Sequence, residues 1–178
     1  ATFMAEQELA RLFAAYIEQT PSRNEDLGAY GASLPAYLQK KLPQKSYLAD
    51  AARLDLARYE LFHLHVLPGK KDIMKQKMKL QGARLWQSRF TLFKTGRKGR
   101  LQPAAGKPQE QMQYAIIYRD AYAVHEHLLT AAQFRFARAL EKGARVAALL
   151  ARAESQNAMP PGEIKQLFQI LGIQGVLA

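Results

Sequence analysis

The sequence contains no cysteine, which excludes a disulfide framework and any metal site built on thiolates. No stretch approaches the roughly 18 consecutive apolar residues that a membrane-spanning helix requires, and the first residues show no export pattern. The chain begins at Ala1 without an initiator methionine, so we expect the natural N-terminus to lie upstream. These features favour a protein of the cytoplasm that contacts no membrane.

Signatures of catalysis and of nucleotide binding are missing as well. The sequence has no GxxxxGK[ST] segment and no strand-linked GxGxxG, the glycine-rich loops that cradle phosphates. No nucleophile beside a base and no pair of converging carboxylates stands out in the sequence. We therefore predict that the protein is not an enzyme and carries no cofactor.

Positive charge is abundant, and its distribution along the chain is uneven. The formal net charge is +11. Residues 1–66 contain seven Lys or Arg against eight Asp or Glu, residues 67–111 contain twelve against two, and residues 112–178 contain seven against five. Nearly all the excess positive charge therefore lies in one quarter of the chain, where clustered charges produce a strong local field.

The first 67 residues have the apolar spacing of helices and predict an all-α domain. Residues 5–19 place apolar side chains at steps of three and four, and two further helices are expected at 33–41 and from residue 46 to His63 or His65. Ser33 and Ser46 are the predicted N-caps of these two helices. The apolar stripe of the third helix is expected to include, or to lie beside, Tyr47, Leu48, Ala51, Leu54, Tyr59 and Phe62.

Residues 77–128 indicate short strands. Polar and apolar residues alternate at 77–81, and large residues suited to a pleated surface follow up to Phe93, among them Trp86, which we expect in the core. Residues 94–110 combine three glycines and two prolines with five basic residues, which predicts a mobile, positively charged loop. The β-forming segments 114–118 and 122–128 predict a hairpin around Arg119 and Asp120.

Three helices are expected to complete the chain. Thr130 followed by Gln133 is a capping-box pattern for a helix that ends at Gly143, and further helices are predicted at 145–155 and 162–171. The predicted fold class is mainly α, with a helical domain at 1–67, a basic linker at 68–82 and a small α+β domain at 83–178. Its short antiparallel sheet and three helices have the layout of a winged helix.

Two His-x-His pairs are the candidate metal ligands. Residues two apart on a helix point about 200° away from each other, so His63 and His65 cannot share a metal unless the helix has unwound. On a strand His125 and His127 share one face, which a metal site can use, but a third ligand is not evident. We favour histidines on the sheet surface that flank a solvated Glu126, and we predict no metal site.

The basic middle segment is the strongest candidate binding site. Such a density of cations binds phosphate backbones through counterion release and needs no contacts to bases. The alternative is a solvated linker that confers solubility. The predicted nucleic-acid-binding residues are Lys70, Lys71, Lys75, Lys77, Lys79, Arg84, Arg89, Arg97, Lys98 and Arg100.

Parts of the sequence resemble a known bacterial family. Residues 27–38 (LGAYGASLPAYL) and 47–57 (YLADAARLDLA) are similar to the HvfC-like family, described as DNA-binding. Residues 83–90 (ARLWQSRF), 117–120 (IYRD) and the helix start at Leu129 and Thr130 resemble its second domain. The sequence departs from the family in lacking its opening helix.

The resemblance implies a helical domain, a small α+β domain and a role in transcription regulation through DNA. Relatives of the family, the MbnC-like proteins of methanobactin synthesis among them, act beside an iron-dependent oxidase and present a ribosomal peptide to it. The resemblance therefore also implies a second function, that of a non-catalytic partner subunit that binds a precursor peptide as an added strand. The basic segment favours duplex DNA as the first partner, although it would also suit an acidic peptide or protein.

Overall fold

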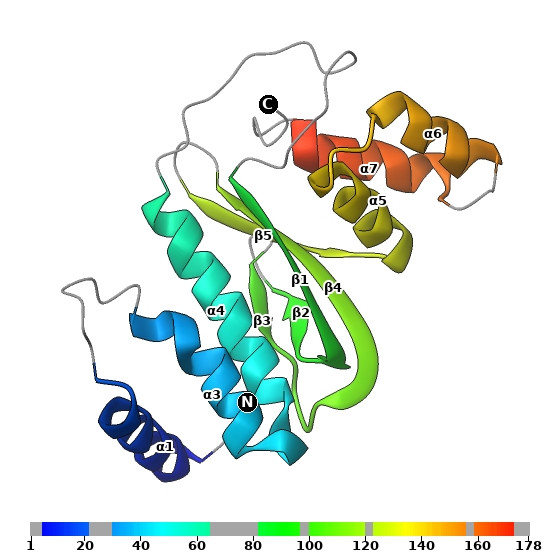
Figure 1. Ribbon diagram of the computed structural model, residues 1–178. Coiled ribbons are helices and arrows are strands. Elements are labelled where there is room, and N and C mark those ends of the chain that lie inside the picture. Colours follow the sequence, from blue (N-terminus) through cyan, green and yellow to red (C-terminus); the bar gives the residue numbers. More distant parts are fainter. Residues whose placement is uncertain are drawn as a thin grey trace.

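The protein has a mixed α+β fold in which helices cover an antiparallel sheet (Figure 1). The computed structural model describes residues 5–21, 30–64, 82–96, 100–119, 123–155 and 159–172. The helices and strands in these ranges are α1 (Glu6–Gln19), α3 (Leu34–Lys41), α4 (Tyr47–His63), β1 (Ala83–Thr91), β2 (Phe93–Thr95), β3 (Leu101–Pro103), β4 (Gln109–Arg119), β5 (Val124–Leu129), α5 (Ala131–Glu141), α6 (Val146–Ser155) and α7 (Pro161–Gly172). Short 3-10 turns at Gly31–Ser33 and Pro43–Lys45 precede α3 and α4.

The main sheet has the strand order β1-β4-β5, and both pairings are antiparallel. Its centre is β4, where four consecutive residues, 115–118, are buried because side chains alternate between two covered faces. A second, two-stranded sheet pairs β2 with β3. The β4–β5 pairing confirms the predicted hairpin, although residues 120–122 of its turn lie outside the described ranges.

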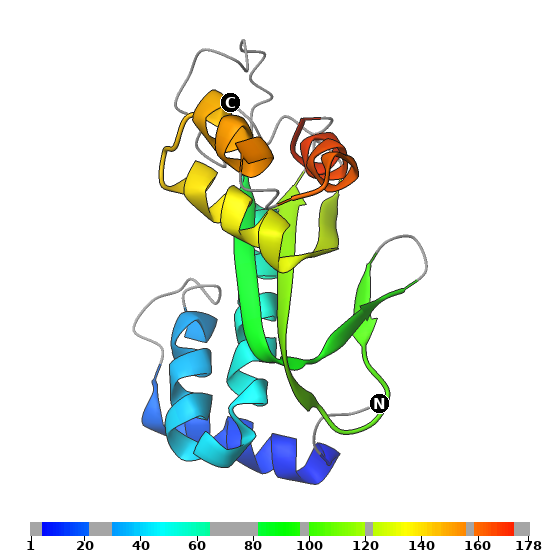
Figure 2. The same ribbon diagram turned by 90° about the vertical axis from the view of Figure 1, so that its right-hand side faces the viewer.

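Different helices cover the two faces of the main sheet (Figure 2). On one face Ile116 and Tyr118 pack with residues of α5, α6 and α7. On the other face Ala115 and Ile117 share a core with α4 and with the β2–β3 pair. The helices α1 and α3 lie beyond α4 and form a smaller apolar cluster with it. The sheet is thus the middle layer of the fold.

Trp86 lies in the core, as predicted. It is 4 % exposed, on the sheet face that packs against α4. Its indole N–H donates a hydrogen bond of 2.7 Å to the backbone carbonyl of Asp50 on α4. The tryptophan therefore ties α4 to β1, and the predicted division into domains at residues 68–82 stays a prediction.

The predicted helix starts are confirmed at α3, α4 and α5, but of these three only α5 has the predicted capping hydrogen bonds. The Thr130 side chain accepts from the Gln133 amide and the Gln133 side chain accepts from the Thr130 amide, a complete capping box. Gly143, with φ of 84°, follows the helix as predicted. Ser33 and Ser46 have helical backbone angles and make no capping bond, because a 3-10 turn leads directly into each helix and an N-cap needs extended backbone.

The prediction of a loop at 94–110 is wrong in part. Residues Leu101–Pro103 form β3, and β4 begins at Gln109. The chain turns between them at Gly106, whose φ of 86° suits glycine. The alternating segment at 77–81 lies outside the described residues.

Candidate nucleic-acid interface

The described part of the chain contains three of the ten predicted nucleic-acid-binding residues, namely Arg84, Arg89 and Arg100. Arg84 and Arg89 lie on β1, and Arg100 directly precedes β3. The others lie outside the described ranges: Lys70, Lys71, Lys75, Lys77, Lys79, Arg97 and Lys98. Binding by the basic segment as a whole therefore stays a prediction.

The two arginines on β1 have different surroundings. The Nε of Arg84 lies 3.2 Å from Oε2 of Glu60 on α4, so an acidic side chain of the protein itself partly offsets this charge. Arg89 lines a polar cavity of about 530 Å³ between α4 and β1, beside the ion pair of Asp50 and Arg53. Only one of the two is therefore left without a carboxylate partner among the described residues.

Arg100 lines a separate cleft of about 650 Å³ formed by α4, β3 and the start of β5. Arg89 and Arg100 thus face different cavities and do not converge on one ligand. The residues that line the cleft are Arg58, Tyr59, Phe62, Arg100, Leu101, Ala123, Val124 and Glu126.

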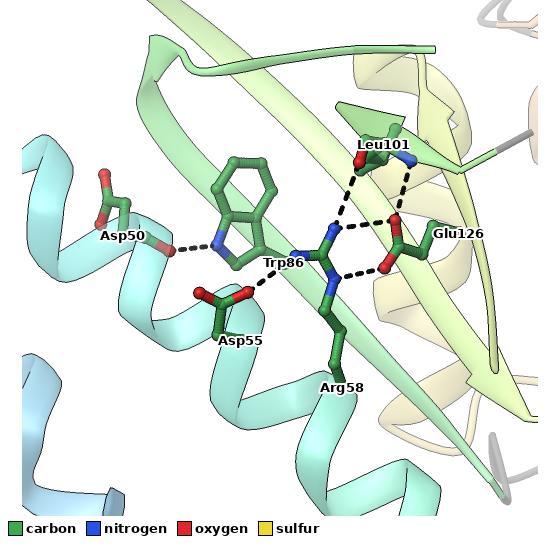
Figure 3. A network of polar contacts seen from close by, with 6 residues as sticks. All are labelled: Asp50, Asp55, Arg58, Trp86, Leu101 and Glu126. Atoms are coloured by element: carbon green, nitrogen blue, oxygen red, sulfur yellow. Dashed lines mark hydrogen bonds and ion pairs between the residues drawn. The ribbon is translucent and has the colours of Figure 1, made fainter. Parts of the chain in front are cut away.

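Arg58 and Glu126, which line this cleft, form a partly buried ion pair. Figure 3 shows the pair from close by. Arg58 of α4 donates two hydrogen bonds to Glu126 of β5, from Nε to Oε1 and from Nη2 to Oε2, the latter at 2.9 Å. Oε2 also accepts the Leu101 amide at 2.8 Å, so Glu126 links α4, β3 and β5. The prediction of a solvated Glu126 is wrong: the residue is 6 % exposed, because its strand position faces α4.

Arg58 stays positively charged in this setting. Burial disfavours its charge, but the hydrogen bonds and negative charges of Glu126 and Asp55 outweigh burial, and the pKa of Arg58 is raised above its usual value. Its Nη1 donates to Asp55 at 2.7 Å. Because Arg58 already has two carboxylate partners, Arg100 is the cation that remains available to a ligand among the described residues of the cleft.

Two exposed aromatic side chains line the cleft, a feature that the sequence did not predict. Tyr59 is 42 % exposed and Phe62 is 65 % exposed, although both were expected on or beside the apolar stripe of the helix. The stripe instead follows the fully buried Leu54 and Leu61, seven residues apart, and Phe62 lies about 100° further round the helix. The seven-residue spacing of the two leucines was the signal in the sequence that distinguishes the buried face of the helix from the exposed Tyr59 and Phe62.

The rim is held in place by Arg119, the last residue of β4. Its Nη1 donates to the carbonyls of Leu61 at 3.2 Å and Leu64 at 2.9 Å, and also to the carbonyl of Phe62. Its guanidinium lies over the Phe62 ring, 5.9 Å from the ring centroid. Arg119 thus satisfies carbonyls at the end of α4 and lies against the ring of Phe62.

The histidine pair on β5 stacks against a tyrosine. The rings of His125 and His127 lie 5.2 and 5.8 Å from that of Tyr118, and the Tyr118 hydroxyl is 3.1 Å from Nε2 of His127. Burial, with a smaller effect from His125, lowers the pKa of His127 below 6.5. Within the described ranges, no group of three or more His, Cys, Asp or Glu side chains could hold a metal ion. His65 of the other pair lies outside those ranges.

Two further findings concern membrane-spanning helices and similarity to known proteins. No helix of the described part is both long enough and apolar enough to cross a membrane. In comparisons with known proteins, no family model matches the chain and no curated protein matches it.

Proposed function

We propose that the protein is a non-catalytic DNA-binding protein of the cytoplasm that takes part in transcription regulation. The observation that carries this proposal is the charge of residues 67–111, with twelve basic side chains against two acidic ones. A cluster of this density binds a phosphate backbone by releasing condensed counterions, whatever the base sequence. We propose that residues 70–100 make these backbone contacts.

The β2–β3 hairpin suits a role as the wing of a winged-helix-like domain. Its described residues Lys94 and Arg100 are exposed and basic, and a wing touches the DNA backbone in such domains. The three helices α5, α6 and α7 follow the sheet and would orient the hairpin on the duplex. In this proposal the sheet and helices position the hairpin, and the cations provide most of the binding affinity.

Salt dependence tests the proposal directly. If about six phosphates are neutralised, the affinity for a random duplex should fall with a log–log slope of about −5 against salt concentration. Fluorescence anisotropy at several salt concentrations measures this slope. Absence of duplex binding at low salt would reject the proposal.

Charge reversal tests which lysines make the contacts. Changing Lys75, Lys77 and Lys79 to glutamate should weaken binding to every duplex sequence alike, because phosphate contacts carry no sequence information. The matched control places the same charge change at exposed lysines outside the segment, namely Lys40, Lys142 and Lys165. Equal losses in the two triple variants would show that only the total charge matters.

The free edge of β1 favours a second candidate function, that of a partner subunit of an iron-dependent oxidase that binds a ribosomal precursor peptide. The strand is nine residues long and lies at the edge of the main sheet, and no described strand pairs with its outer side. An extended peptide can add to such an edge through backbone hydrogen bonds. Slower amide exchange in β1 on addition of the precursor peptide, and recovery of an iron oxidase in a pull-down from the native organism, would support this candidate over the first.

A further inference from the structure

The cleft between α4, β3 and β5 combines two exposed aromatic rings with an available guanidinium. Tyr59 and Phe62 line it, and Arg100 has no ion-pair partner among the described residues. Large aromatic side chains normally bury most of their surface, so two of them at the rim of one cleft mark a binding surface. Single-stranded nucleic acid is the polyanion that fits this pair of features, because each nucleotide carries a flat base beside a charged phosphate.

We infer that this cleft binds an unpaired base together with its neighbouring phosphate, as found in single-stranded DNA or RNA. Bases stack on aromatic side chains in proteins that bind single strands, and arginine binds phosphate through paired N–H groups. Bases inside a duplex are already stacked and paired, so their faces cannot reach Tyr59 or Phe62. The inference rests on the proposed nucleic-acid function and adds the strand state that this cleft recognises.

The geometry of the cleft is suited to binding without rearrangement. Arg119 donates to carbonyls at the end of α4 and lies over the Phe62 ring, and the Arg58–Glu126 ion pair joins α4 to β5 in the lining of the cleft. Side chains that are already ordered lose little conformational entropy when a ligand binds. An acidic peptide with aromatic residues could use the same groups, but a single strand places a flat base and a charged phosphate in every unit, which matches the rings beside Arg100.

The test compares a labelled thymidine oligonucleotide of about 16 nucleotides, the same oligonucleotide with abasic sites, and a duplex of equal length, by anisotropy at low salt. Phe62→Ala should weaken binding of the intact single strand by about tenfold, the effect of losing one stacked base. Phe62→Ala should leave the affinity for the duplex unchanged. Phe62→Trp should bind the intact single strand as tightly as the wild-type protein does. Phe13→Ala, at a side chain 37 % exposed on α1, is the matched control and should change nothing.

The abasic strand separates stacking from charge. The wild-type protein should bind it about tenfold more weakly than the intact strand, and Phe62→Ala should cause no further loss, because the ring has lost its base. Equal affinity for intact and abasic strands would overturn the inference, whereas duplex binding in the same experiment would still support the proposed DNA-binding function. Failure of every oligonucleotide to bind would contradict both the inference and the proposed function. Phe62-dependent binding of a peptide of alternating aspartate and phenylalanine, without such binding of the single strand, would also overturn the inference.

Discussion

Glu126 is the buried carboxylate on which α4, β3 and β5 converge. Glu126→Gln keeps the shape of the side chain but leaves the half-buried Arg58 with only Asp55 as a charged partner. We expect the free energy of unfolding to fall by about 2 kcal/mol, less than for a fully buried pair because Arg58 is partly exposed. Urea denaturation measures the change. The control Asp55→Asn removes a carboxylate whose side chain is 71 % exposed and should cost less than about 0.5 kcal/mol.

His127 should make the stability depend on pH. Its pKa is lowered in the folded protein by burial, so the unfolded chain binds more protons as the pH falls below 6.5. Protonation therefore favours the unfolded state, and the free energy of unfolding should decrease from pH 7 towards pH 5. His127→Gln should flatten this decrease, as followed by urea denaturation at each pH. The same substitution at the exposed His63 serves as the control, and an equal flattening there would contradict the assignment to His127.

Two helix starts offer a matched comparison at the level of elements. Thr130→Ala removes the capping hydrogen bond of α5 and the hydroxyl that donates to Glu163 of α7 at 2.6 Å. We expect the free energy of unfolding to fall by about 1 to 2 kcal/mol. Ser46→Ala at the start of α4 removes no capping bond and should be almost neutral. Thermal unfolding followed by circular dichroism measures both, and equal losses would contradict the difference in capping.

The sequence predicted the elements with strong periodicity and missed those that depend on distant partners. Regular apolar spacing identified α1 and α7, and the β-forming run at 114–118 identified the core of β4. The capping box at Thr130 was found because both halves lie within four residues. The burial of Glu126 was not predicted, because its partner Arg58 is 68 residues away and local sequence patterns do not reveal so distant a contact. Ser33 and Ser46 stand at the predicted helix starts, but neither makes a capping bond, because a 3-10 turn precedes each helix and gives these residues helical backbone angles.

At the scale of the molecule, charge along the chain did not predict charge in space. The sequence placed Arg89 and Arg100 in one basic segment, whereas the fold directs them into two different cavities. The pleat of β1 and the place of Arg100 directly before β3 decide these directions, and neither follows from composition. The cleft itself could not be predicted, because it forms from α4, β3 and β5 only when the layers pack.

We expect the whole chain to unfold in one transition. Leu54 and Leu61 of α4 share a core with Ile117 of β4, so the helical part and the sheet cannot separate without exposing apolar surface. Fluorescence of Trp86, the single tryptophan, and circular dichroism should give the same denaturation midpoint. Leu54→Ala should lower the free energy of unfolding by about 2 to 5 kcal/mol, and both midpoints should fall together. Separate midpoints would instead support independent domains at 1–67 and 83–178.

The long separation between Arg58 and Glu126 also has a consequence during synthesis of the protein. The apolar face of α4 acquires the last of its covering strands only after the ribosome has added more than 60 further residues, up to β5. At about 5 to 20 residues per second, Leu54 and Leu61 remain incompletely covered on the nascent chain for several seconds. This interval gives a holdase chaperone time to bind the emerging helix, and the newly made protein should depend on such help more than the refolded one.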